Sequence, residues 1–140
     1  MAGVKVLPVE ECPDVICQYV SVTLSTDAVD TELTHDAYIM YCEQDTIVDA
    51  AFMSFTTVDG GNNATYTLQA VAAGTGPEGS GTAFTNSPTS GATADSTITF
   101  TITETANIIP AGSRIALKVA DNASDIEGIN ITLRIRTRLP

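Results

Sequence analysis

Apolar and polar residues alternate without a break over residues 129–138, near the C-terminal end of the chain. Strict alternation predicts a β-strand with one buried face and one solvent-facing side, because successive side chains of a strand point in opposite directions. The polar positions include Arg134, Arg136 and Arg138, which are three of the six basic residues of the chain. The pattern therefore predicts a strand with a dry face and a basic face.

Short segments of the same kind recur from residue 19 onward, separated by turn-forming residues. The patterns predict strands at residues 19–24, 37–41, 46–57, 65–72, 97–103 and 113–120, with a shorter candidate at 82–84. The sequence Asp-Gly-Gly-Asn-Asn at 59–63 predicts a hairpin turn, since Gly and Asn tolerate positive φ. Residues 108–112 are predicted to form another turn, and no segment carries a convincing helical pattern.

Seven or eight strands without a helix favour two packed antiparallel sheets. We therefore predict an all-β fold, an antiparallel β-sandwich that is jelly-roll-like. An immunoglobulin-like sandwich is the second choice, because the chain has no Trp and no pair of cysteines at a suitable spacing.

Residues 1–18 differ from the remainder, because they contain charge and turn chemistry but no sustained period. We predict an extended N-terminal arm at 1–18 and one β-sandwich domain at 19–140. A domain of this length can bury a stable core without disulfide bonds or metal ions. The arm is expected to provide apolar anchoring through the residues around Pro8, which are Val4, Val6, Leu7 and Val9.

Charge is unevenly distributed along the chain, whose formal net charge is −11. Residues 1–113 contain one basic residue, Lys5, against fourteen acidic residues, whereas residues 114–140 contain five basic and three acidic residues. Nucleic-acid affinity comes mainly from Lys and Arg that neutralise phosphates, so no nucleic-acid partner is predicted. The chain has no run of 18 apolar residues and no long apolar N-terminal segment, so we expect no membrane span and synthesis in a cytoplasm.

Three cysteines and one histidine are the strongest candidates in this chain for a catalytic or metal-binding role. An odd number of cysteines in a domain of this size favours reduced thiols over a disulfide framework. His35 beside Asp36 suggests a base for the Cys42 thiol, but a lone histidine next to an acidic residue is more typical of a turn. Cys12, Cys17, His35 and Cys42 are residue types that bind zinc, yet their spacing matches no familiar zinc motif, and unpaired packed cysteines explain them better.

Other polar clusters fit turns better than ligand sites. The acidic residues at 27–36 and the segment 121–128 lack the spacing of a calcium loop. The glycine-rich stretch 74–79 lacks the Lys-Ser or Lys-Thr of a phosphate loop. Matches to the glycosylation pattern at Asn63, Asn122 and Asn130 are near chance in a chain so rich in Ser and Thr. We therefore predict no enzyme, no cofactor and no metal site.

The basic strand at 129–138 has two interpretations. Its arginines can protect an exposed sheet edge against aggregation, because charge discourages edge-to-edge pairing. Alternatively, Arg134, Arg136 and Arg138 contact an acidic surface of a neighbour, because complementary charge orients partners. The second interpretation is favoured, and the two are not exclusive.

Three segments resemble those of a known family: residues 22–31, residues 108–119 and the closing strand at 129–138. They are similar to small β-rich virion proteins of tailed bacteriophages, the head decoration or cement proteins. The resemblance implies a β-sandwich that forms a homotrimer on the outside of the head and bridges subunits of the major capsid protein. It carries over no catalytic residue.

The residues and the resemblance together predict a structural virion protein, made in the host cytoplasm, that decorates and stabilises a bacteriophage capsid. Its partners are expected to be the major capsid protein and copies of itself, with no nucleic acid and no membrane. The alternative is a receptor- or glycan-binding module on a phage tail or fibre. That module would use the long segment 73–96, in which Phe84 is the only aromatic residue.

Overall fold

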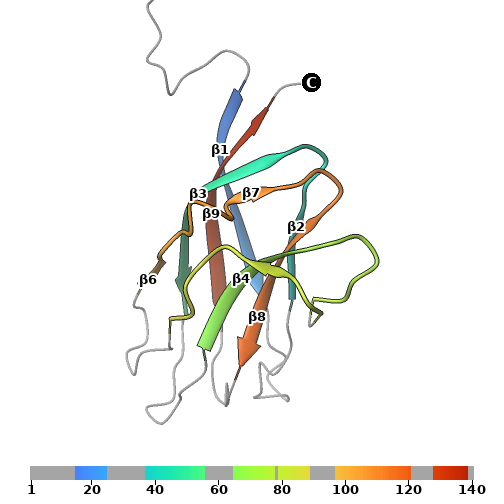
Figure 1. Ribbon diagram of the computed structural model, residues 1–140. Helices are drawn as coiled ribbons and strands as arrows, with labels where there is room; N and C mark the ends of the chain where they lie inside the picture. Colours follow the sequence, from blue (N-terminus) through green and yellow to red (C-terminus); the bar gives the residue numbers. More distant parts are fainter. Residues whose placement is uncertain are drawn as a thin grey trace, which may run out of the picture.

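A computed structural model describes residues 15–24, 37–55, 65–77, 79–88, 97–120 and 128–138 (Figure 1). The described residues form strands and turns, with no helix among them. The strands are β1 (Val15–Leu24), β2 (Ala37–Tyr41), β3 (Thr46–Ser54), β4 (Thr65–Val71), β5 (Thr82–Ala83), β6 (Thr97–Phe100), β7 (Ile108–Ile109), β8 (Arg114–Ala120) and β9 (Ile129–Arg138).

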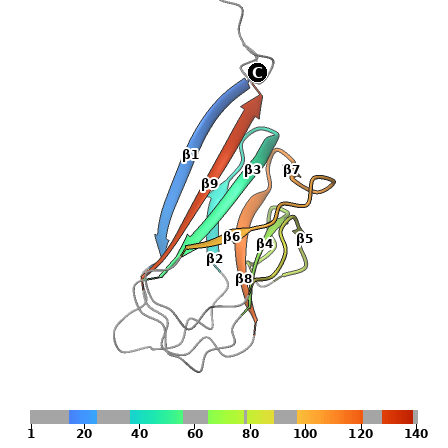
Figure 2. The same cartoon turned by 90° about the vertical axis from the view of Figure 1, so that its left-hand side faces the viewer.

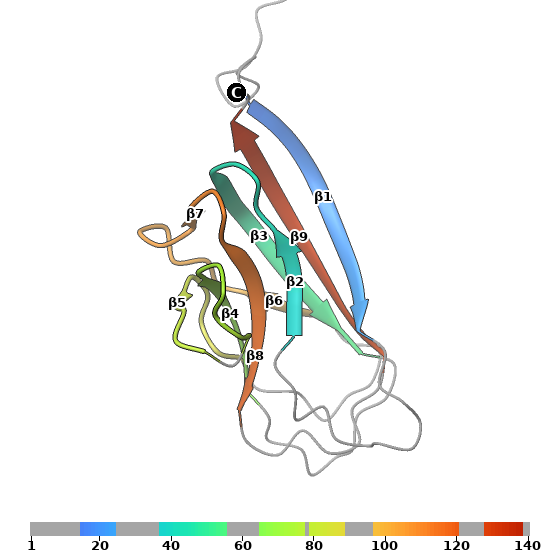
Figure 3. The ribbon, with the colours of Figure 1, turned by 90° about the vertical axis from the view of Figure 1, so that its right-hand side faces the viewer.

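The strands make two antiparallel sheets that pack face to face (Figures 2 and 3). One sheet has the order β1-β9-β3-β6, with β7 also paired to β3, and the other has the order β2-β8-β4-β5. The pairs β4–β5, β3–β6, β2–β8 and β1–β9 are nested inside one another along the chain. A chain folded as one long hairpin and rolled into two sheets is a jelly roll, so the predicted all-β sandwich is confirmed.

The core lies between the sheets and follows the alternation of the sequence. In β9 the apolar positions are buried and the intervening ones face outward, as predicted. Complete burial of one aliphatic side chain stabilises the fold by about 1.5–3 kcal/mol, so the core is the main favourable contribution. The largest fully buried side chains are Tyr66, Phe55, Phe84, Met53, Leu68, Ile109, Ile115, Leu117, Ile129, Ile131 and Leu133.

The first strand starts earlier than the sequence pattern predicts. β1 begins at Val15 rather than at residue 19, because β9 continues to Arg138 and pairs with it (Val15↔Arg138). The β1–β9 pair consequently extends beyond the other strands at one end of the molecule (Figure 3). The predicted arm residues Val4, Val6, Leu7 and Val9 lie outside the described residues, as does the predicted hairpin turn at 59–63.

A second difference concerns residues 108–112, which were predicted to form only a turn. Ile108 and Ile109 instead form β7 against the start of β3, with Ile109 buried and Ile108 exposed. The turn follows at once, and Gly112 adopts φ of 84°, a value that favours glycine. Pairing with β3 therefore extends the sheet at a position where the local sequence predicts a turn.

The connection between β4 and β5 covers part of the outer face of the four-stranded sheet. We call residues 72–81 of this connection the strap, of which residue 78 is not described. The Gln69 side-chain amide donates hydrogen bonds to the carbonyls of Pro77 and Gly79, at 2.9 and 3.2 Å. Val71 and Ala116 are buried although they do not belong to the core between the sheets. The strap thus buries a second, smaller apolar layer.

Candidate interaction surfaces

The outer face of the five-stranded sheet carries the basic residues predicted from the last strand. Arg134 lies between Tyr19 of β1 and Ala50 of β3 in the register of the sheet. Further along β9, Thr132 lies opposite Ser21 on one side and Phe52 on the other. This surface, which we call the β9 face, is therefore a continuous sheet surface with an arginine near its middle.

β9 is a central strand, since it pairs with β1 on one side and β3 on the other. The interpretation that its arginines protect a sheet edge is therefore wrong, because the edge at this side of the sheet is β1. Alternation identifies a half-buried strand but does not identify its neighbours. The charges on β9 therefore lie on the face of the sheet, where a partner protein could contact them, and not at an edge where another strand could pair.

The arginines of β9 differ in what they already bind. Arg136 forms a two-pronged ion pair with Asp49, with Nε–Oδ2 at 2.6 Å and Nη2–Oδ1 at 2.8 Å. A register shift between Val48 and Ala50 makes Asp49 the extra residue of a β-bulge, two positions along β3 from Ile47, which lies opposite Arg136. Arg136 therefore has an internal structural role, which sequence reasoning missed. A role for it at a partner interface stays a prediction.

Arg134 is exposed and forms no ion pair with any residue that the structure describes. Arg138 pairs with Val15 through the strand register, but its side chain lies outside the description. Among the predicted arginines with described side chains, Arg134 is thus the one whose guanidinium is available to a partner.

A hydrogen-bond network links β1 and β9 on the same face. Ser21 Oγ donates to Asn130 Oδ1 at 3.2 Å and lies 3.1 Å from the Thr132 hydroxyl. Asn130 Nδ2 donates to the Thr23 hydroxyl at 3.1 Å, and the Thr132 hydroxyl donates to Asn130 Oδ1 at the same distance. These bonds hold short side chains in fixed positions, so the β9 face is polar and locally ordered.

A second surface, absent from the sequence predictions, lies on the outer face of the four-stranded sheet. The guanidinium carbon of Arg114 lies 5.3 Å from the ring centre of Tyr38 and 5.6 Å from that of Tyr41. The two tyrosines are 43% and 53% exposed. Cation–π contacts of this kind have ring distances below about 6 Å. We call these three residues the Tyr–Arg patch.

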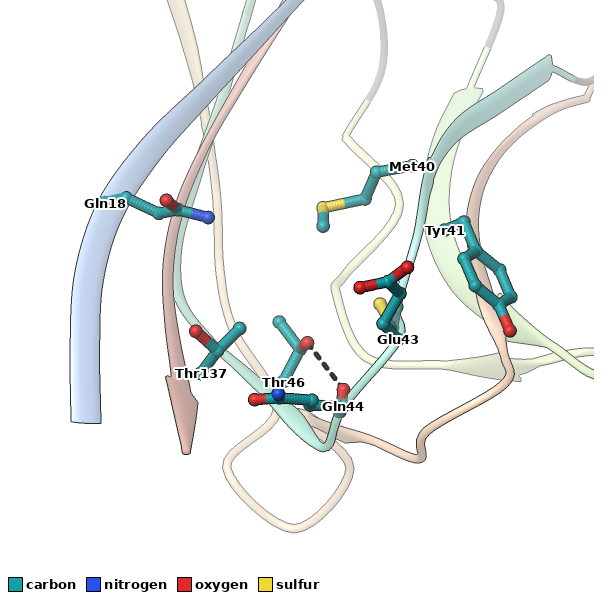
Figure 4. A pocket seen from close by; sticks show the side chains of 8 residues that line it. Gln18, Met40, Tyr41, Glu43, Gln44, Thr46 and Thr137 are labelled. Carbon is teal, nitrogen blue, oxygen red and sulfur yellow. Dashed lines mark hydrogen bonds between the residues drawn. The ribbon is translucent and has the colours of Figure 1, made fainter. Parts of the chain in front are cut away.

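An open pocket of about 440 Å³ lies at one end of the sandwich, between the β1–β9 pair and the corner joining β2 to β3 (Figure 4). Gln18 and Thr137 lie on one side, whereas Met40 and Glu43 lie on the other. The Thr46 hydroxyl donates to the Gln44 carbonyl at 2.9 Å. The lining contains amides, hydroxyls and one carboxylate.

The Cys42 thiol also lines this pocket and is almost fully buried. Burial raises the pKa of Cys42, because an apolar environment disfavours the thiolate, and a side-chain hydrogen bond with Thr46 offsets part of this effect. A raised pKa is the opposite of what an activated nucleophile needs. Cys12 and His35 lie outside the described residues, as does the side chain of Cys17.

Two searches were restricted to the described part of the chain. There, no three His, Cys, Asp or Glu side chains gather in an arrangement that could hold a metal ion. Among the same residues, no helix has the length and apolar character needed to cross a membrane.

Phe84, the aromatic residue on which a sugar-binding loop at 73–96 would depend, is fully buried in the core. Its backbone N–H donates to the Leu68 carbonyl, and its carbonyl accepts from the Thr103 N–H. Phe84 is therefore a core residue, and it cannot present its ring to a saccharide.

Two solved structures are similar to this chain. A chain in the capsid of Ralstonia phage GP4 has a TM-score of 0.57 and 16% sequence identity, covering 99% of this chain and 94% of that chain. A chain in the capsid asymmetric unit of cyanophage Pam1 has a TM-score of 0.49 and 20% identity, covering 91% of this chain and 86% of that chain. No family model matches the sequence, and no curated protein matches it.

At 16% identity, the likeness to the GP4 chain shows a shared fold. The chain is thus a jelly-roll sandwich of the type found in a phage capsid. The correspondence extends over nearly all of both chains, so the whole sandwich is shared rather than one of its sheets.

Proposed function

We propose that this protein is a structural component of a bacteriophage virion that decorates the exterior of the capsid and stabilises it. It binds the major capsid protein and copies of itself, as a homotrimer, and it has no enzymatic activity. The observation that carries the proposal is the whole-length likeness to a chain in the capsid of Ralstonia phage GP4. The resemblance of three sequence segments to phage head decoration proteins supports it independently.

The β9 face is the surface best suited to meet the shell. It is a broad sheet surface on which hydrogen bonds fix the hydroxyl and amide groups, and Arg134 stands exposed among them. A rigid polar surface loses little side-chain entropy on binding, and an exposed guanidinium can bind a carboxylate with two hydrogen bonds. Arg134 would therefore orient the protein on an acidic region of the major capsid protein, with Val4, Val6, Leu7 and Val9 as apolar anchors.

Stabilisation would follow from mass action. A protein that binds the assembled shell but not the loose subunits lowers the free energy of the shell relative to those subunits. A concentration of free protein about 100-fold above the dissociation constant would contribute about 2.7 kcal/mol per site. Such a role needs no reacting group.

Co-sedimentation with undecorated capsids of the parent phage tests the proposal. Wild-type protein should pellet with the capsids and saturate at a fixed ratio to the major capsid protein. Arg134→Glu should weaken this binding by about tenfold, because the reversed charge would repel an acidic surface. Lys118→Glu is the matched control, since it makes the same charge change at an exposed position of the other sheet. If wild-type protein stays in the supernatant, the proposed function is wrong.

The alternative function is a receptor- or glycan-binding module on a phage tail or fibre. The burial of Phe84 removes the aromatic platform expected of the 73–96 segment, whereas the exposed Tyr38 and Tyr41 offer rings elsewhere. A glycan array probed with the wild-type protein distinguishes the two functions.

A further inference from the structure

The Tyr–Arg patch exists because β2 contains a β-bulge. Tyr38 and Tyr41 are three residues apart, a spacing that would place them on opposite faces of a regular strand. In β2 the register jumps from Tyr38↔Ala116 to Met40↔Ile115, so Ile39 is an extra residue that turns toward the core. The bulge brings both tyrosines to the outer face, and bulges often redirect side chains at functional positions.

The patch is held in place before any partner arrives. The Tyr38 hydroxyl donates a hydrogen bond to the Thr75 carbonyl of the strap, at 2.5 Å. Arg114 lies opposite Tyr41 in the strand register, and its guanidinium is near both rings. Rings and guanidinium therefore restrict one another, which lowers the entropy lost when a partner binds.

The guanidinium of Arg114 has unused binding capacity. It donates no hydrogen bond to, and forms no ion pair with, any residue that the structure describes. An arginine with contacts to aromatic rings and free N–H groups suits a carboxylate, which can accept two parallel hydrogen bonds. Tyr and Arg are also the residue types most enriched where protein partners bind tightly.

The chain itself offers the complementary surface, because its formal net charge is −11. Glu43, Asp45 and Glu104 are exposed, and none forms an ion pair with a residue in the described ranges. Repulsion between such acidic chains opposes self-association unless a basic group lies at the contact. Arg114 is a basic group placed where it can provide that contact.

We propose that the Tyr–Arg patch binds a second copy of this chain, with Arg114 paired to a carboxylate of that copy. The inference rests on the proposed function in so far as self-association belongs to it, and it identifies the surface involved. The Tyr–Arg patch and the β9 face lie on opposite sheets, so one molecule can contact a sister copy with one sheet and the shell with the other.

Sedimentation equilibrium of the purified full chain tests this pairing. Arg114→Glu should raise the dissociation constant of self-association by at least about tenfold. Arg114→Lys keeps the charge but lacks the planar guanidinium that can donate two parallel hydrogen bonds, so we expect a smaller loss of affinity, of about threefold. Lys118→Glu, four residues from Arg114 on the same strand and the same face, should change the dissociation constant by less than about twofold. Thermal unfolding of each variant verifies that it is folded.

Three results would overturn the proposal. The first is a wild-type protein that stays monomeric, and the second is an Arg114→Glu variant that self-associates as tightly as wild type. The third is an equal loss of self-association affinity in Arg114→Glu and Lys118→Glu, which would reveal a general charge effect. Binding of monomeric wild-type protein to acidic saccharides on a glycan array would assign the patch to sugars instead. Capsid co-sedimentation separates this inference from the proposed function. Self-association that survives Arg114→Glu would contradict the inference, whereas failure of the wild-type protein to bind capsids would contradict the proposed function.

Discussion

The ion pair between Asp49 and Arg136 is expected to stabilise the fold measurably. Its two hydrogen bonds join charged groups at 2.6 and 2.8 Å. Hydrogen bonds to charged groups contribute about 1.5–3 kcal/mol when buried, whereas exposed ion pairs contribute about 0.2–1 kcal/mol. The arginine and aspartate side chains are 33% and 19% exposed, between these two cases. We therefore expect a coupling free energy of about 1–2 kcal/mol.

A double-mutant cycle measures this coupling. The variants Asp49→Ala, Arg136→Ala and the double variant are unfolded with urea and followed by circular dichroism. Arg136→Ala alone should lower the melting temperature by about 3–8 °C, given the usual scaling for a chain of this length. Arg134→Ala is the matched control on the same strand face, and it should change the unfolding free energy by less than about 0.5 kcal/mol.

A coupling below about 0.3 kcal/mol would refute this reasoning, because it would mean that the ion pair does not persist in solution or that water replaces it without cost. The same result would remove the reason for leaving Arg136 out of charge-reversal experiments on capsids. The expected result instead makes Arg134→Glu the appropriate charge reversal in capsid experiments, since Arg136→Glu would place two carboxylates together and destabilise the sheet.

Three further predictions concern the packing beneath the strap and in the core. Gly81→Ala should cost about 1–3 kcal/mol, because the new Cβ would lie 2.6 Å from the Ala70 carbonyl oxygen, and urea unfolding measures the loss. Thr85→Val should cost a similar amount, about 1–3 kcal/mol, because the Leu68 N–H would lose its buried acceptor, whereas Thr85→Ser keeps the hydroxyl and should cost less. Cys42 should react with iodoacetamide much more slowly in the native than in the unfolded protein, as peptide mass spectrometry can measure, because burial raises its pKa. Equal alkylation rates in the native and unfolded protein would contradict the prediction. Because the Cys42 thiol ionises at lower pH in the unfolded chain than in the folded protein, the free energy of unfolding should fall as pH rises above the usual cysteine pKa.

The strands could be predicted because alternation determines which side of a strand faces the core. β2 and β9 have the predicted bounds, and β4 and β8 differ from them by one residue at one end. The nested pairing that makes the sandwich a jelly roll could not be read from the strand pattern alone, which also fitted an immunoglobulin-like sandwich, because it depends on contacts between strands far apart in the chain. β7 was missed because two residues before a proline carry no period, and its formation depends on contact with β3.

Both surfaces depend on features that alternation alone does not reveal. The ion pair of Arg136 depends on β3 lying beside β9, and the Tyr–Arg patch needs the bulge at Ile39. In β3 the buried positions shift from even to odd numbers between Val48 and Ala51, which records the bulge in the structure rather than in the sequence. In β2 all five residues are apolar or aromatic, so the sequence shows no period that a bulge could shift. Which strand lies beside β9 depends on the whole fold.

The temperature at which phage particles release their DNA tests the proposed stabilising role most directly. Particles lacking this protein should release DNA at a lower temperature than complete particles, and added wild-type protein should restore the higher value. Arg134→Glu protein should restore less of it at equal concentration, because it binds the shell more weakly. If particles with and without the protein release DNA at the same temperature, the protein does not stabilise the capsid.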